Sequence, residues 1–165
     1  MIRMSGPFNR KTSSNKLRLV SACLIGIDCR YDGKNNTNQR LIRLFRKGKL
    51  IPVCPEQLGG LPTPRDGAQI INGTGKDVLE GRARVVDKKG HDVTENFIKG
   101  AMETLKIAKY LGVKEAILKA RSPSCGSGKI HKGFSDVLID GDGVTATLLK
   151  MNGIRIFTEE EFVVE

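Results

Sequence analysis

The 165-residue sequence lacks tryptophan, has only two histidines, and draws only 5% of its residues from the aromatics. So few aromatic side chains predict a core built mainly from Leu, Ile and Val. No apolar run approaches the roughly 20 residues that a membrane-spanning helix needs, so we expect no membrane association. The first residues also lack the apolar segment of a secretory signal. These absences together predict a cytoplasmic protein, in which cysteines are normally reduced.

The four cysteines do not form the closely spaced pairs that are typical of a structural zinc site. The nearest two, Cys23 and Cys29, are separated by five residues, whereas Cys54 and Cys125 stand alone. This spacing argues against a zinc finger or ribbon. Three interpretations remain open: a metal or cluster site assembled by the fold, inert buried thiols, or redox chemistry that includes a Cys23–Cys29 disulfide.

Positive charge exceeds negative charge, with a formal net charge of +10 and a pI of about 9.7. Such an excess favours polyanionic partners such as nucleic acid, although a solvated basic surface is the alternative. The first acidic residue is Asp28, and every charged residue before it is basic, namely Arg3, Arg10, Lys11, Lys16 and Arg18. We therefore divide the chain into a basic N-terminal arm, residues 1–16, and a single domain, residues 17–165.

Apolar runs with strand-like length alternate with segments of helical spacing along the domain. Strands are expected at 17–25, 50–54, 113–120 and 154–162, and helices at 40–48, 94–111 and 144–153. A small hairpin or flap pairs AQII with RARVVD, and FSDVLIDGDG reads as a loop followed by a turn. The alternation predicts a single-domain α/β fold: a mostly parallel sheet with helices on both faces, in a Rossmann-like three-layer arrangement with a hairpin insertion.

Three of the four cysteines stand where a predicted strand ends, namely Cys23, Cys54 and Cys125. In a parallel sheet the carboxyl ends of the strands open onto one crevice, and ligands bind there. These thiols are therefore expected to meet. An iron–sulfur cluster accepts thiolates from separate loops, and three protein thiolates leave one metal position open for a substrate.

Polar residues that suit catalysis accompany the cysteines. Glu56 follows Cys54 by two residues and suits general acid or base chemistry. Ser122 and Ser124 flank a proline just before Cys125, and their hydroxyls suit either substrate binding or the loop's own backbone. A basic side chain suited to carboxylate, phosphate or base-edge contacts stands beside each loop: Arg30, Arg65 and Arg121.

A partial phosphate-binding motif and the two histidines are weaker signals. SCGSGK resembles part of a phosphate-binding loop, but Pro123 replaces the required first glycine and Ile130 replaces the final Ser or Thr, so we reject a nucleoside triphosphate site. His91 lies in a polar turn and reads as a surface residue. His131 is closer to Cys125 and could form hydrogen bonds with the ligands of the site.

Three segments, SACLIGIDCRYDG, VCPEQLGGLPTPR and ARSPSCG, resemble the thiouracil desulfidase-like family in the same order over residues 17–160. The resemblance implies a compact α/β protein that holds a [4Fe-4S] cluster with three cysteines and removes sulfur from thiolated uracil. Fused relatives act on thiouridine in tRNA. By this resemblance the ligands are Cys23, Cys54 and Cys125, and Cys29 is not counted among them. The acid/base carboxylate is Glu56.

The same resemblance puts the active-site serine at Ser122 or Ser124. We hypothesise a non-redox desulfidase in which Glu56 activates water against a thiolated pyrimidine base, nucleotide or tRNA. Two alternatives stay open. A basic RNA-binding module with structural cysteines predicts an RNA affinity that does not depend on iron. A thiol redox or sulfur-carrier protein predicts a reactive Cys23–Cys29 pair with a lowered pKa.

Overall fold

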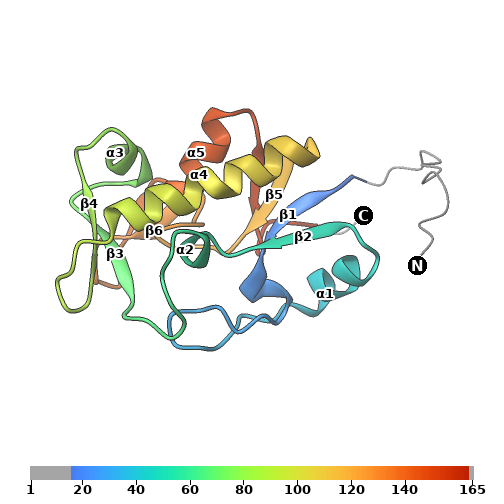
Figure 1. Ribbon diagram of the computed structural model, residues 1–165, viewed down its shortest axis with the longest axis horizontal. Helices are drawn as coiled ribbons and strands as arrows, with labels where there is room; N and C mark the ends of the chain where they lie inside the picture. Colours follow the sequence, from blue (N-terminus) through green and yellow to red (C-terminus); the bar gives the residue numbers. More distant parts are fainter. Residues whose placement is uncertain (1–15, 164–165) are drawn as a thin grey trace, which may run out of the picture.

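A four-stranded parallel sheet forms the centre of the computed structural model, which describes residues 16–163 (Figure 1). The strand order is β2-β1-β5-β8, so β1 pairs with β2 on one side and with β5 on the other. The four strands are β1 (Arg18–Ser21), β2 (Leu50–Val53), β5 (Glu115–Leu118) and β8 (Arg155–Thr158). Of the predicted basic arm, only Lys16 falls within the described residues.

Helices cover both faces of this sheet, as the alternation of elements predicts. Leu41 and Leu44 of α1 (Gln39–Arg46) pack with Val20 on one face. Leu149 of α5 (Val144–Met151) packs with Leu19 on the other, together with α4 (Thr94–Leu111). Successive residues of a strand point to opposite faces, so β1 contributes to both cores. The three-layer α/β prediction is confirmed.

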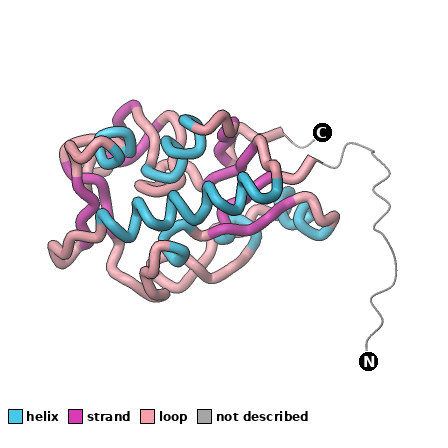
Figure 2. The backbone as a smooth tube through the Cα atoms, turned by 45° about the horizontal axis from the view of Figure 1, so that its top comes forward, coloured by secondary structure: helices cyan, strands magenta, loops and turns pink. Residues whose placement is uncertain are grey.

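Smaller elements surround the sheet: α2 (Pro55–Leu58), α3 (Gly75–Leu79), the antiparallel hairpin of β3 (Ala68–Ile71) and β4 (Arg84–Asp87), and that of β6 (Lys129–His131) and β7 (Leu138–Asp140). Figure 2 shows the long helix α4 running from the central sheet to the β3–β4 hairpin. No helix among residues 16–163 has the length and apolar character needed to cross a bilayer.

Two sequence expectations need correction. The first strand ends at Ser21 rather than at residue 25, and the apolar run continues as a 3-10 helix, η1 (Ala22–Ile25). The turn is held by later backbone, because the Asn36 N–H donates to the Cys23 carbonyl at 2.8 Å. The segment FSDVLIDGDG is not only a loop, since Leu138–Asp140 forms β7. Three-residue strands are too short for a pattern in the sequence to reveal.

A buried carboxylate ties the amino ends of the strands together. Glu115, at the start of β5, accepts hydrogen bonds from Lys16 at 2.6 Å and Arg18 at 2.7 Å, and from Arg155. Burial alone would raise the pKa of Glu115, but these three donors outweigh it and lower the pKa to about 2. This ion cluster lies at the end of the sheet opposite the cysteine loops.

We expect Glu115→Gln to lower the free energy of unfolding at pH 7 by about 2 kcal/mol, a value reduced because water screens the exposed Lys16 and Arg155. The wild-type pKa is about 2 in the fold and 4.5 ordinarily, so this stabilisation is complete above pH 4.5 and disappears as the pH falls toward 2. Urea unfolding over a pH series measures the difference. Glu103→Gln removes an exposed pair with Lys106 and is the control. If the difference in free energy of unfolding between the wild type and Glu115→Gln is the same at every pH, the ionised Glu115 does not supply this stabilisation.

Candidate active site

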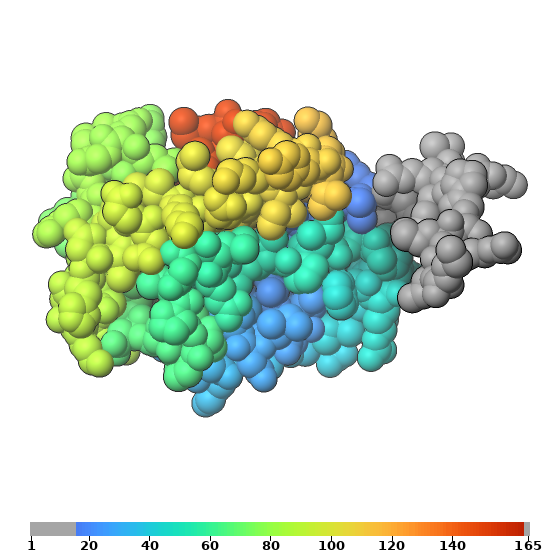
Figure 3. All heavy atoms as spheres, viewed as in Figure 1, coloured from blue at the N-terminus to red at the C-terminus, as the bar shows by residue number. Residues whose placement is uncertain are grey.

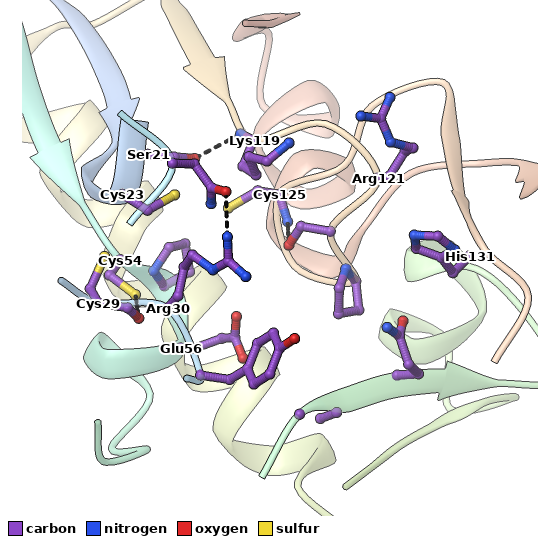
Figure 4. Close-up of a pocket in the computed structure, with 18 of the residues that line it drawn as sticks. Ser21, Cys23, Cys29, Arg30, Cys54, Glu56, Lys119, Arg121, Cys125 and His131 are labelled. Carbon is purple, nitrogen blue, oxygen red and sulfur yellow. Dashed lines mark hydrogen bonds between the residues drawn. The ribbon is translucent and has the colours of Figure 1, made fainter. Parts of the chain in front are cut away.

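A cavity of about 480 Å³ opens at the carboxyl ends of β1, β2 and β5 (Figure 4). The strands β1 and β5 are neighbours, yet the helices that follow them, α1 and α5, cover opposite faces of the sheet. Parallel sheets bind their ligands at such a switch point, because the two departing chains leave a crevice between them.

All four cysteines line this cavity. Cys23 comes from η1, Cys29 from the loop after it, Cys54 from the end of β2, and Cys125 from the loop after β5. Figure 4 shows the sulfur atoms of Cys23 and Cys125 pointing into the same space, with Cys54 and Cys29 beside it. All four are free thiols, so the structure contains no Cys23–Cys29 disulfide.

The environment divides the thiols into two kinds. Hydrogen bonding from the Cys29 thiol lowers the pKa of Cys23, and it lowers that of Cys54 to about 7, although burial opposes both shifts. The same bonds raise the pKa of Cys29, which therefore keeps its proton. Burial raises the pKa of Cys125 to about 12, so this thiol ionises only when a cation such as a metal ion binds it.

Two glycines bring Cys54 and Glu56 into position. Cys54 caps α2 and Glu56 lies in its first turn. A Cβ atom placed on Gly100 of α4 would stand 1.8 Å from the carbonyl oxygen of Pro55, and one placed on Gly59, the residue after α2, would stand 1.9 Å from the carbonyl oxygen of Asn96 in α4. The two helices thus touch through their backbones, which any side chain at these positions would prevent.

Arg65 orients Glu56 from the side of the cavity. Its Nε donates to Glu56 Oε1 at 3.4 Å, while its other nitrogens donate to the carbonyl oxygens of Cys29 at 3.0 Å and Pro62 at 3.1 Å. The Arg65 side chain is only 5% exposed. Its N–H groups are therefore used within the protein, and Arg65 holds the loop of Cys29 against the segment that carries Glu56 and Pro62.

The two serines of the SPSC loop have different surroundings. Ser122 lines the cavity, and its Oγ accepts the backbone N–H of Cys125 at 3.0 Å and of Ser124 at 3.2 Å. Both acceptor sites are then filled, so the Ser122 proton is free to donate into the cavity. Ser124 is buried and shares a 2.9 Å hydrogen bond with Thr145 of α5, away from the cavity lining.

Arg30 and Arg121 both line the cavity, but they face different partners. Arg30 reaches toward the centre of the view in Figure 4, held by Asn36 at 2.7 Å and Asp32 at 2.9 Å. Arg121 donates to both carboxylate oxygens of Glu160, at 2.7 and 3.0 Å, on the side away from Cys23 and Cys54. The structure therefore gathers Arg30 with the thiols and directs Arg121 outward.

The donor set suits a cluster better than a single ion. Within residues 16–163, no three Cys, His, Asp or Glu side chains lie close enough to share one metal ion. A four-iron cluster makes a different demand, because each thiolate binds its own iron atom and the thiolates stand farther apart. Four free thiols from separate segments line the 480 Å³ cavity, and thiols are the protein groups that such a cluster takes as ligands.

Comparison with known proteins shows the family of this chain. Residues 19–161 match the family model described as 2-thiouracil desulfurase. The chain belongs to this family. It is 50% identical over 144 residues to the uncharacterized protein YbbK of Bacillus subtilis (strain 168), covering 87% of this chain and 95% of YbbK. It is also similar to the solved structure of the [4Fe-4S]-dependent thiouracil desulfidase TudS, with 40% identity, a TM-score of 0.77, and coverage of 88% of this chain and 91% of that one.

The cavity of this family member also holds residues that sequence reasoning missed. Tyr31, Asn36 and Lys119 line it. Lys119 directly follows β5, so its place at a strand end was a usable signal, and its Nζ pairs with Glu159 at 2.5 Å. His131 lines the far part of the cavity, and its buried Nδ1 has no hydrogen-bond partner among the described residues.

We expect Gly100→Ala to lower the free energy of unfolding by about 2–3 kcal/mol, because the new methyl group forces α2 away from α4. The direction is informative, since Gly→Ala inside a helix ordinarily raises stability by up to about 1 kcal/mol. Urea unfolding measures it. Met102→Ala, at an exposed position of the same helix, is the control and should change stability by no more than about 0.5 kcal/mol. A stabilised Gly100→Ala variant would show that the backbones do not touch.

Proposed function

We propose that this protein is a [4Fe-4S]-dependent, non-redox desulfidase that removes sulfur from a thiolated pyrimidine of the thiouracil or thiouridine type. One observation carries the proposal: Cys23, Cys54 and Cys125, distant in sequence, reach one cavity together with the carboxylate of Glu56. Membership of the 2-thiouracil desulfurase family and the similarity to a [4Fe-4S]-dependent thiouracil desulfidase support it.

Cys23, Cys54 and Cys125 would hold the cluster in this proposal. Cys29 is left out because its thiol retains its proton between the sulfur atoms of Cys23 and Cys54. When bound, a cluster with three protein ligands supplies a Lewis-acidic iron that polarises the thiocarbonyl group of a substrate. The protonated Cys29 thiol has one hydrogen, which it donates to one of its two neighbouring ligands, Cys23 or Cys54.

Glu56 is the proposed general base. Its Oε1 accepts the Arg65 N–H, whereas Oε2 has no hydrogen-bond partner within residues 16–163. This oxygen accepts a proton from water as the water oxygen adds to the carbon that bears sulfur. The carbon–sulfur bond then breaks, so a thiocarbonyl and water become a carbonyl and hydrogen sulfide with no change of oxidation state.

Ser122 and Arg30 are proposed to position the substrate. The free Ser122 proton donates to an acceptor on the pyrimidine ring or to the attacking water. Cations outnumber acids around the cavity, with Arg30, Lys88 and Lys119 among its lining residues. A neutral base offers these cations no charge, so we propose that the substrate carries phosphate, as a nucleotide or within RNA. Ser124, which faces α5, has no role here.

One observation favours a second candidate, a thiol redox protein. Cys23 has a lowered pKa and hydrogen-bonds to Cys29, which is the arrangement that a reactive pair needs. Iron-free protein separates the two functions. A redox protein reduces a small disulfide without iron and loses this activity in Cys29→Ser, whereas the proposed desulfidase has no such activity.

Iron content distinguishes the cluster ligands from their neighbour. After anaerobic reconstitution, we expect Cys23→Ser, Cys54→Ser and Cys125→Ser to lose most bound iron and sulfide. Cys29→Ser should keep them, because a hydroxyl still donates the hydrogen bond. Colorimetric iron and sulfide assays measure both. Equal iron loss in all four variants would instead indicate a cluster with four thiolate ligands and no open iron.

Replacement of Glu56 tests the proposed chemistry. Glu56→Gln should bind iron normally and slow turnover of thiolated pyrimidines by about 100- to 10,000-fold, because the amide cannot accept a proton. Release of sulfide from a panel of thiolated bases and nucleotides measures the rate. Glu95→Gln, an exposed carboxylate in the first turn of α4, is the control and should be fully active. Near-normal turnover of Glu56→Gln would assign Glu56 a structural role.

A further inference from the structure

The net charge of this chain is concentrated in two segments. Residues 1–16 contain four cations and residues 33–55 contain six, and neither segment contains an acid. Together they account for the whole formal charge of +10, since the remaining eighteen cations are matched by eighteen acids. The rest of the chain, which includes the carboxylate-bearing parts of the site, is electrically balanced.

Five of the six cations in the second segment lie on or just after α1. We call them the α1 basic surface: Arg40, Arg43, Arg46, Lys47 and Lys49. The first four are exposed and Lys49 is half-buried. Every ion pair within residues 16–163 involves other cations, so this surface is uncompensated there.

Helix stability does not explain this arrangement. Cations near the carboxyl end of a helix interact favourably with its dipole, which accounts for Arg43 and Arg46. Arg40, however, lies in the first turn, where a positive charge is unfavourable and where α1 has no acidic residue. The apolar residues Leu41 and Leu44 already anchor the helix to the sheet. The charges therefore point to an external partner.

The α1 basic surface connects the cavity to the start of the described chain. Asn36, which lines the cavity, precedes the Asn38 cap of α1 by two residues. At the other end, the Lys49 carbonyl accepts the backbone N–H of Arg18 at 3.1 Å, two residues from Lys16. In Figure 3 the teal atoms of α1 form one side of the described surface. The segment that carries the α1 basic surface thus starts beside the cavity and ends beside the first residues of β1.

We propose that the α1 basic surface binds the phosphate backbone of an RNA strand whose modified base occupies the cavity. Arginine and lysine contacts to phosphate are independent of base sequence, which suits an enzyme that must accept many flanking sequences. The inference deepens the proposed function and rests on it in one respect. Uracil is a base of RNA, and this selects RNA over DNA.

An anionic membrane is the competing partner for a basic helix, and the packing of α1 disfavours it. Interfacial helices bury an apolar face in the lipid. The apolar face of α1 is already occupied, because Leu41 and Leu44 are buried against the sheet and the half-buried Ile42 packs on the same core. Of the four apolar residues of this helix, Phe45 alone is exposed. Phosphates of a polynucleotide need only the charged face.

Binding of unmodified oligouridylate to the full-length protein tests the proposal, measured by fluorescence anisotropy over a range of salt concentrations. The variant Arg40→Gln/Arg43→Gln/Lys47→Gln removes three charges from the surface. It should weaken binding on the order of tenfold and flatten the logarithmic salt dependence by about two, at roughly 0.7 per phosphate contact. Lys99→Gln/Lys106→Gln/Lys109→Gln removes three exposed charges from α4 and should change neither. Both variants should desulfurate free thiouracil like the wild type.

Each outcome separates the surface from the proposed function. Unchanged RNA binding by the α1 variant, or equally weakened binding by the α4 variant, overturns the proposal for the surface. The proposed desulfidase function still stands in that case if the protein desulfurates thiouracil. RNA binding through α1 in a protein that desulfurates no thiolated pyrimidine supports the surface and contradicts the function. Binding to vesicles that contain phosphatidylserine, lost in the α1 variant and unaccompanied by RNA binding, assigns the surface to a membrane instead.

Discussion

The parallel pairing of β1 with both β2 and β5 is the constraint on which the site depends. Ser21 lies opposite Val53 of β2, and Val20 lies opposite Ile117 of β5, so the three strands end at one edge. The chain must leave this edge through three separate loops, and each loop carries a cysteine. No local motif brings these thiols together, because 101 residues separate Cys23 from Cys125. The sheet supplies the geometry that close spacing supplies in a zinc finger.

Backbone contacts without intervening side chains then hold the loops in place. Gly100 lets α2 lie on α4, and Gly143 lets the start of α5 lie on the SPSC loop, where an added Cβ would stand 2.5 Å from the Ser124 carbonyl. Arg65 joins two of the loops through Cys29 and Glu56. A cavity that must present thiols at defined positions benefits from such rigid supports, because they leave few alternative loop positions.

Charge is divided among three regions that do different work. At the amino edge of the sheet, Glu115 and its three cations stabilise the fold. At the carboxyl edge, the Cys29 thiol lowers the pKa of Cys54, whereas burial raises the pKa of Cys125. The α1 basic surface is uncompensated among the described residues and pairs with neither. Folding thus uses balanced charge, whereas the cations of the α1 basic surface take part in none of the ion pairs among the described residues.

The sequence by itself determined the layout: the alternation of strands and helices, the β3–β4 hairpin, and three cysteines and Glu56 at strand ends. Periodicity and turn residues encode these features locally. Only the tertiary structure decided where β1 ends and η1 begins. It also decided that Ser124 bonds to Thr145, that Arg121 bonds to Glu160, and that Cys29 has the thiols of Cys23 and Cys54 as hydrogen-bond partners. The reason is physical. Side-chain directions in loops follow from contacts with residues far along the chain, and a single sequence carries no local signal for them.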